Sequence, residues 1–234
     1  MTTDSSQRPS LAVYRFSSDF FQTHQLSTIE PFIQTICARI NEGYDQIHGK
    51  YGYLDTKCPR IEDHRNFVEE FHLLDDAAYI LLLVKDPEIG DDEISTKLKS
   101  KDVPLVEVTT EEILKYNSLQ VHDIIGSITM KPLESTPSQM EPKAFISFFK
   151  GAGRFLLEFI EPLVVKENPK VTHLMVQVVV CHELVPLYVK FGYVEYLPRQ
   201  RQVVKQGVIV EGCMTGVPAH KDFEITWMNK QIRF

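Results

Sequence analysis

The sequence predicts an α/β fold in which strands and helices alternate. The composition is that of a globular protein, with 43% hydrophobic and 24% charged residues in a chain of 234. Short apolar runs of strand length recur along the chain, separated by runs with apolar residues three and four positions apart, as on one face of a helix. The longest apolar run, residues 77–84, is shorter than the roughly 20 residues of a membrane-spanning helix. We therefore expect no membrane span and no fibrous or disordered chain.

The polar start of the chain indicates where the protein is located, and the charge balance limits which partners it can have. MTTDSSQRPS lacks the basic start and apolar stretch of a secretory signal, which predicts a flexible lead-in over 1–10 and a cytoplasmic or nuclear protein. One domain is expected over 11–234. The net charge of −7 argues against nucleic acid and against an anionic membrane surface as partners. A monomer and a homodimer are both compatible with the sequence.

The four cysteines are expected to be free thiols, and no metal is expected. They lie far apart, without a CxxC pair or a histidine at zinc-ligand spacing, and the histidines show no H-E-x-x-H pattern. The residues concerned are Cys37, Cys58, Cys181 and Cys213.

The first part of the chain predicts a strand followed by a helix. LAVYRF at 11–16 has the alternation of a strand, and a capping box, S-x-x-E, begins a helix over 27–43 that Gly43 ends. The segment 49–60, GKYGYLDTKCPR, is expected to be a loop that either lies over a substrate site or packs against the core.

The next elements are a second helix and a central strand. Phe67, Phe71 and Leu74 share one face of a helix predicted over 61–75, and AAYILLLV at 77–84 reads as a strand buried on both faces. The charged stretch 85–120 is then expected to be an insertion, with a short helix at TTEEILKY, residues 109–116.

The remaining chain predicts five more strands and two helices. The segment 133–142 is expected to form a turn, and Pro162 is expected to kink or end its helix near Glu161. The predicted strands are 121–132, 143–149, 172–180, 193–198 and 222–230, and the helices follow residue 153 and cover 182–191.

A glycine-rich loop is the first sign of a binding site. Gly151-Ala152-Gly153 follows an apolar strand and precedes a helix, where backbone N–H groups and the positive helix end can bind an anion. Such glycines also serve ordinary tight turns. The third glycine of a dinucleotide-binding fingerprint and the Gly-Lys-Ser/Thr ending of a P-loop are both absent from the sequence at this position.

Three motifs in order resemble the GNAT superfamily of acyl-CoA-dependent N-acyltransferases over most of the chain. They are FFKGAGR at 148–154, LYVKFGY at 187–193 and WMNK at 227–230. The resemblance implies a GNAT-type α/β (α+β) fold, with a mixed, mostly antiparallel central sheet of six to seven strands flanked by about four helices. It also implies an N-acetyltransferase that moves the acetyl group of acetyl-CoA directly to a primary amine in a ternary complex.

The same resemblance assigns roles to residues. The CoA pyrophosphate loop would be Phe148, Phe149, Lys150, Gly151, Ala152, Gly153 and Arg154. Tyr188 takes the position of the group that protonates the CoA sulfur, although a core aromatic would look the same. A backbone N–H near Phe148 or Phe149 would polarise the thioester carbonyl. His182 is the first candidate for the base, with Glu183, Glu195 and ordered water as alternatives.

Departures from the family pattern leave a second interpretation open. Phe148 stands where the family has Gln or Arg, and Cys181 stands where it has Asn. A catalytically degenerate module that binds CoA or only a protein partner is therefore the alternative function. The acceptor amine would be a small molecule or a protein amine. The acidic stretch 86–93 would suit a cationic amine or would simply be a solvated face.

Overall fold

A computed structural model describes residues 9–55, 57–109, 118–133, 136–210 and 214–233, and the structural statements below concern these residues. The α-helices are α1 (Ser18–Thr23), α2 (Leu26–Tyr51), α3 (Phe67–Glu70), α4 (Asp91–Ser100), α6 (Ala152–Glu167) and α7 (Leu184–Lys190), and the 3-10 helices are η1 (His64–Asn66), η3 (Val121–Asp123) and η4 (Val180–His182). Within these ranges no helix combines the length and the apolar character that crossing a membrane requires.

One nine-stranded sheet organises the molecule. Its order is β3-β1-β2-β4-β5-β6-β11-β7, with β8 paired to β11, and among the described residues only the pairs β1–β3 and β5–β6 are parallel. A separate two-stranded sheet joins β9 to β10. The strands are β1 (Leu11–Ser17), β2 (Tyr79–Lys85), β3 (Leu105–Glu107), β4 (Ile124–Leu133), β5 (Thr136–Ser147), β6 (His173–Val179), β7 (Val194–Glu195), β8 (Gln202–Val204), β9 (Ile209–Val210), β10 (Met214–Pro218) and β11 (Phe223–Gln231).

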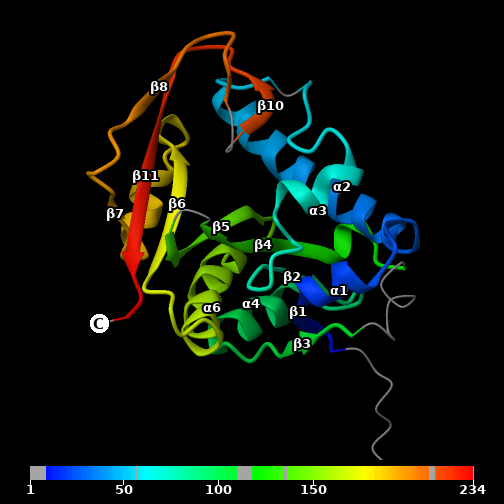
Figure 1. The fold of residues 1–234 in the computed structure, drawn as a ribbon. Coiled ribbons are helices and arrows are strands. Elements are labelled where there is room, and N and C mark those ends of the chain that lie inside the picture. The colour runs from blue at the N-terminus through cyan, green and yellow to red at the C-terminus, as the bar shows by residue number, and fades with distance from the viewer. Residues whose placement is uncertain (1–8, 56, 110–117, 134–135, 211–213, 234) are drawn as a thin grey trace, which may run out of the picture.

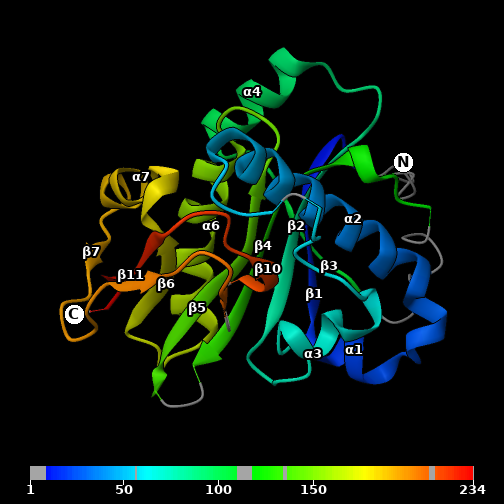
Figure 2. The same ribbon diagram turned by 90° about the horizontal axis from the view of Figure 1, so that it is seen from above.

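Helices cover both faces of this sheet. In Figure 1, α2 and α3 lie on one side of β4 and β5, and α4 and α6 lie on the other. One core joins α2 and α3 to the sheet, and a second core joins α4, α6 and α7 to its opposite face. Seen from above, α2 crosses over the middle strands (Figure 2). The predicted fold class is confirmed, with more strands than the six to seven expected.

A third, smaller core links the loop after α2 to the end of the chain. Leu54 forms an isolated bridge with Ala219, and the N–H of His220 donates to the carbonyl oxygen of Tyr53. The buried residues of this core are Leu54, Val179, Val204, Ala219, Phe223 and Ile225. Part of the predicted loop 49–60 is therefore core packing that ties α2 to β6 and β11.

The prediction that Gly43 ends its helix is wrong. The helix begins at Leu26, before the predicted capping box, and continues to Tyr51, where Gly52 at φ 66° donates its N–H to the carbonyl of His48. Gly43 lies inside α2 because the helix packs closely on β5 there. A Cβ at this position would lie 2.6 Å from Cγ2 of Ile146.

The helix predicted over 61–75 is also wrong, since only η1 and α3 form. His72 adopts a left-handed conformation at φ 54°, which ends the helical turn after Phe71. Phe67 and Phe71 are buried as expected, whereas Leu74 is exposed.

Three further expectations need correction or fall outside the described residues. Most of the predicted turn 133–142 belongs to β5, where Pro142 lies next to a shift in register, a place at which a strand tolerates a missing N–H. Pro162 does not end α6, which continues to Glu167 because Leu163 and Val164 are buried beyond it. The predicted helix at 109–116 lies outside the described residues apart from Thr109, while α4 and β3 form elsewhere in the stretch 85–120.

Two glycines of α2 give a matched test of this packing. We expect Gly43→Ala to lower the free energy of unfolding by about 1–3 kcal/mol, because the new methyl overlaps Ile146. Gly49→Ala meets nothing within 4 Å and should instead gain up to about 1 kcal/mol of helix propensity. Urea unfolding of both variants measures the difference, and equal stability of the two would contradict close packing at Gly43.

Candidate active site

The candidate site is the gap where β5 and β6 part. The two strands pair only at Gln139 with His173 and at Met140 with Leu174, so that the following residues of each strand diverge. A cavity of about 610 Å³ opens between them, lined also by α2, α7 and the loop after β5. The two strands are parallel, but their pairing lies before residue 143 and leaves 143–147, the part expected to be a strand, without pairing to β6.

A β-bulge in β5 accompanies this separation. Ser127 of β4 pairs with Ile146, but Thr129 pairs with Lys143, so β5 has one extra residue in this interval. Ala144 adopts φ 46° within the bulge, and its carbonyl accepts a 2.7 Å hydrogen bond from Oγ of Ser127. A bulge bends its strand and increases the local twist. It therefore turns the end of β5 away from the line of β6.

The two phenylalanines after β5 anchor the loop to opposite cores. Phe148 packs on the α2 side, where the Arg39 guanidinium carbon lies 3.4 Å from its ring centroid, and Phe149 packs on the α6 side. The N–H of Phe148 donates to the carbonyl of Ile125. That N–H is therefore not free to polarise a thioester carbonyl, which corrects one of the two positions expected for this role.

The glycine-rich loop forms an open N-terminus on α6. Gly151 precedes the helix at φ 96°, a conformation that favours glycine, and a Cβ there would meet nothing within 4 Å. The N–H of Gly153 donates to Oγ of Ser147, a contact that the sequence did not indicate. Within the described ranges, the N–H groups of Gly151 and Arg154 have no acceptor. These N–H groups and the helix dipole make an anion-binding end of the cavity.

Most of the predicted loop residues line the cavity. Phe148, Phe149, Lys150, Gly151, Gly153 and Arg154 do so, whereas Ala152 does not. Ala152 is fully buried in the core on the α6 side, and its N–H donates to the carbonyl of Phe149. It supports the loop from behind.

Tyr188 reaches the cavity from α7, which confirms a helix within 182–191. Its side chain is buried, and its ring packs edge-on against Tyr193 with centroids 5.2 Å apart. Burial raises the pKa of the Tyr188 phenol above its ordinary value. The phenol is therefore protonated at neutral pH, as a proton donor must be.

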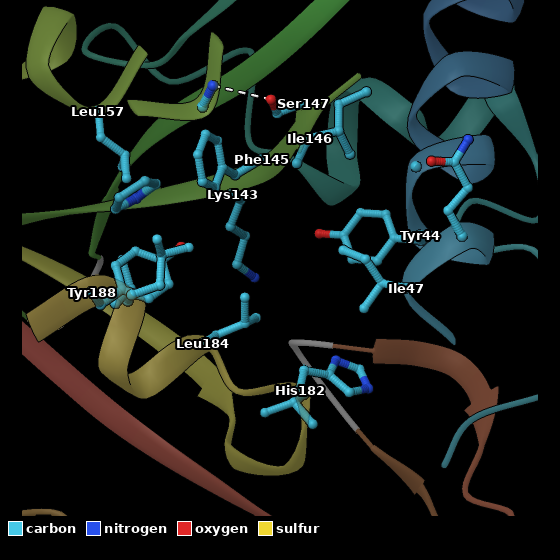
Figure 3. A pocket seen from close by; sticks show the side chains of 18 of the residues that line it. Tyr44, Ile47, Lys143, Phe145, Ile146, Ser147, Leu157, His182, Leu184 and Tyr188 are labelled. Atoms are coloured by element: carbon cyan, nitrogen blue, oxygen red, sulfur yellow. Dashed lines mark hydrogen bonds between the residues drawn. The ribbon is translucent and has the colours of Figure 1, made fainter. Parts of the chain in front are cut away.

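His182 lies across the cavity in a row of aromatic rings. Tyr51 stacks on it at 5.1 Å, and the ring of His48 lies 6.0 Å away. Both histidines are buried and line the cavity; Nε2 of His182 and both ring nitrogens of His48 have no hydrogen-bond partner among the described residues. Figure 3 shows His182 and Tyr188 on different walls of the cavity. The sequence does not indicate His48 as a site residue, because the predicted helix ends at Gly43.

The other candidate bases lie outside the cavity lining. Oε2 of Glu183 accepts a hydrogen bond from the Tyr51 hydroxyl. Glu195 lies on the edge strand β7 and forms an ion pair with Arg201. This contact lowers the pKa of the Glu195 carboxyl group. The structure therefore brings His182, but neither glutamate, to the cavity wall.

Two charged residues of β5 also line the cavity and were not predicted. Glu141 is 3% exposed, and burial raises the pKa of its carboxyl group. Its Oε2 lies 3.9 Å from Nζ of Lys143 and 3.8 Å from Nζ of Lys131. Glu141 falls within the predicted turn 133–142, and Lys143 begins the predicted strand 143–149 but belongs to no motif, so neither was expected at a site.

The fold and cavity define a protein of the GNAT acetyltransferase fold. A structure from Staphylococcus epidermidis, named a probable acetyltransferase, matches with a TM-score of 0.50 at 8% identity, covering 94% of this chain and 98% of that one. A protein of Desulfovibrio desulfuricans that is placed in the GNAT family matches with a TM-score of 0.49 at 12% identity, over 95% and 99% of the two chains. An N-acetyltransferase from Staphylococcus aureus Mu50 gives 0.45 at 8%, over 95% and 97%.

The family assignment is more specific. The chain belongs to the family of sporulation protein RMD6, whose model matches residues 7–232. No curated protein matches the sequence. At identities this low, the similarity to the solved structures shows the fold alone.

The buried histidines predict a pH dependence of stability. Burial lowers the pKa of His48 to about 4, so the unfolded chain, with its ordinary value of 6.5, binds a proton that the folded chain does not. Stability should therefore fall as the pH drops from 7 to 5, by about 1–2 kcal/mol for this residue. Urea unfolding at both pH values should show a smaller fall in His48→Gln. An unchanged fall would mean that His48 does not titrate in this way.

Proposed function

We propose that the chain is an N-acetyltransferase that transfers the acetyl group of acetyl-CoA directly to a primary amine, using the domain predicted over 11–234. The separation of β5 from β6 over a cavity carries the proposal. One end of this cavity is the N-terminus of α6, and a buried phenol lies on its wall. Membership in the RMD6 family argues neither for nor against catalysis. The GNAT fold supports the proposed acetyl transfer.

The residues at the α6 end fit the pyrophosphate of CoA. The N–H groups of Gly151 and Arg154 have no acceptor in the described part of the chain, and the side of Gly151 that faces outward is open. Lys150 and Arg154 add positive charge at the same end. Arg154 forms an ion pair with Glu158 one helical turn on, which holds its side chain along α6. Backbone donors and cations together are the usual partners of a phosphate.

The reaction requires two proton transfers, which we place on different walls of the cavity. The neutral amine attacks the thioester carbonyl; the C–N bond forms, the C–S bond breaks, and the sulfur leaves as a thiolate. We assign protonation of this thiolate to Tyr188, which recovers a proton from solvent. The amine nitrogen loses its proton on the α2 side. His182 has a pKa lowered to about 4 by burial, so it is neutral at pH 7 and passes that proton on to water.

Binding of acetyl-CoA is the first test. Calorimetric titration should give a micromolar Kd, about −8 kcal/mol. Arg154→Ala should weaken binding by about 3-fold or more, because a phosphate loses a cation. Lys166→Ala removes the same charge from the last turn of α6 and serves as the control. No binding at millimolar acetyl-CoA would instead favour a module that acts through a protein partner.

Tyr188→Phe tests the proton donor. This variant should lower the rate of CoA release with the best amine from a screen by about 10-fold or more, with the Kd of acetyl-CoA nearly unchanged. Tyr193→Phe is the control, because Tyr193 is buried against Tyr188 but does not line the cavity. An unaltered rate in Tyr188→Phe would remove this residue from the mechanism.

A further inference from the structure

The last turn of α2 connects the two parts of the sheet across the gap between β5 and β6. The helix packs on β5 through Gly43, which lies against Ile146, and it then reaches η4, the short helix that follows β6. Its contacts with η4 include the rings of His48 and Tyr51, which are three residues apart and therefore lie on one face of the helix. In Figure 3, α2 and His182 of η4 lie on the same side of the cavity, away from Tyr188.

Tyr51 contacts this segment at two points. Its ring stacks on the imidazole of His182, with the centroids 5.1 Å apart and the planes inclined by 23°. Its hydroxyl group donates a 3.1 Å hydrogen bond to Oε2 of Glu183, the next residue along the chain. The stack acts on the imidazole itself, and the hydrogen bond acts on the chain that carries it.

The backbone at Glu183 needs support of this kind. Glu183 adopts φ 56° and ψ 22°, a left-handed conformation that is uncommon for residues other than glycine. Such a conformation persists only where the surrounding structure holds it, and it is often found at functional sites. Glu183 also joins the turn that carries His182 to the helix that carries Tyr188. The contact with Tyr51 therefore supports the junction between the two candidate catalytic residues.

The imidazole of His182 has no hydrogen bond at Nε2 that would hold it in place. This atom is buried and has no partner in the part of the chain that the structure describes. A histidine that moves a proton is usually oriented by a hydrogen bond at its second ring nitrogen. At His182 the rings of Tyr51 and, at 6.0 Å, of His48 lie beside the imidazole instead. Ring contacts therefore have to supply much of the orientation.

We propose that Tyr51 is a positioning residue, which holds the imidazole of His182 in one orientation toward the acceptor amine through the ring stack and the hydrogen bond to Glu183. The inference rests on the proposed function, in which His182 passes the proton of the amine to water. Tyr51 is not among the described residues that line the cavity, so it acts through His182 and not on the substrate. A displacement of about 1 Å in a reacting group can cost on the order of 100-fold in rate.

Substitutions of Tyr51 separate its two contacts. Tyr51→Leu removes both, and we expect kcat with the best amine from a screen to fall by about 10-fold, with the KM of acetyl-CoA changed by less than about 2-fold. Tyr51→Phe keeps the stack and loses the hydrogen bond, so kcat should fall by only about 3-fold. Glu183→Gln keeps an oxygen that accepts from the tyrosine hydroxyl and should retain most of the turnover. Tyr53→Leu is the control, because Tyr53 packs on the third core and should not affect kcat.

NMR of the histidine rings gives a readout that does not depend on activity. A stacked aromatic ring shifts the protons of the ring beneath it upfield. The His182 signals, identified by their absence in His182→Gln, should therefore move downfield in Tyr51→Leu. They should stay near their original positions in Tyr51→Phe and in Tyr53→Leu. Binding of acetyl-CoA by each variant shows that the variant is folded.

The outcomes distinguish this inference from the proposed function. His182 signals that do not move in Tyr51→Leu would show that the stack is absent in solution and would overturn the positioning role. An unchanged kcat in Tyr51→Leu would overturn it as well. If Tyr51→Leu does not fold, an unchanged kcat in Tyr51→Phe decides against the role in the same way. A wild-type chain that neither binds acetyl-CoA nor releases CoA with any amine would overturn the proposed function, and the role of Tyr51 with it.

Discussion

The register shift at Ala144 is the constraint on which the site depends. A non-glycine residue at φ 46° in the middle of a strand costs about 1 kcal/mol or more, and the structure retains it with a hydrogen bond from Ser127 to the same residue. The bulge bends β5 where its pairing with β6 ends. Without this bend the two strands could pair along their length, and the cavity, with Lys143 on its wall, would be filled by a continuous sheet.

The close approach of α2 builds the other half of the site. Gly43 lets the helix lie against Ile146, and the next two turns then carry His48 to the cavity and Tyr51 onto the ring of His182. Both ring nitrogens of His48 and Nε2 of His182 lack partners among the described residues, which is costly in a core, about 1–3 kcal/mol for each unsatisfied group. A ligand or water in the cavity that supplies the missing hydrogen bonds would offset this cost. The same unpaired nitrogens thus lower the stability of the folded chain and are available to bind a ligand.

The sequence predicted those parts of the molecule in which local pattern and tertiary packing agree. The run at 77–84 is a central strand, and the two glycines at 151 and 153 begin a helix, because continuous burial and conformational freedom are visible in the residues themselves. Prediction failed where contacts from distant residues decide. Gly43 is a helix breaker by propensity, but β5 needs a residue without a side chain there. Pro142 indicates a turn by propensity, yet it belongs to a strand.

The same reasoning explains which site residues could be found. Tyr188 and the loop after β5 were found through a resemblance to a family motif, which local sequence preserves. His48, Glu141 and Lys143 carry no such motif, and they become neighbours only through the crossing of α2 over the parted strands. Their burial at the cavity depends on tertiary packing, which cannot be derived from spacing along the chain.

The limited pairing of β5 with β6 has a consequence for the cooperativity of the molecule. Backbone pairing across this boundary occurs at two positions only, so the unit of β6, β11, β7 and β8 joins the rest of the sheet through few main-chain bonds. The bridge of Leu54 with Ala219 and the core around it close the opposite side. Side-chain packing at a distance from the chemistry therefore helps to set the width of the cleft, and we expect this unit to exchange its amide hydrogens as a subdomain, before the remaining strands do.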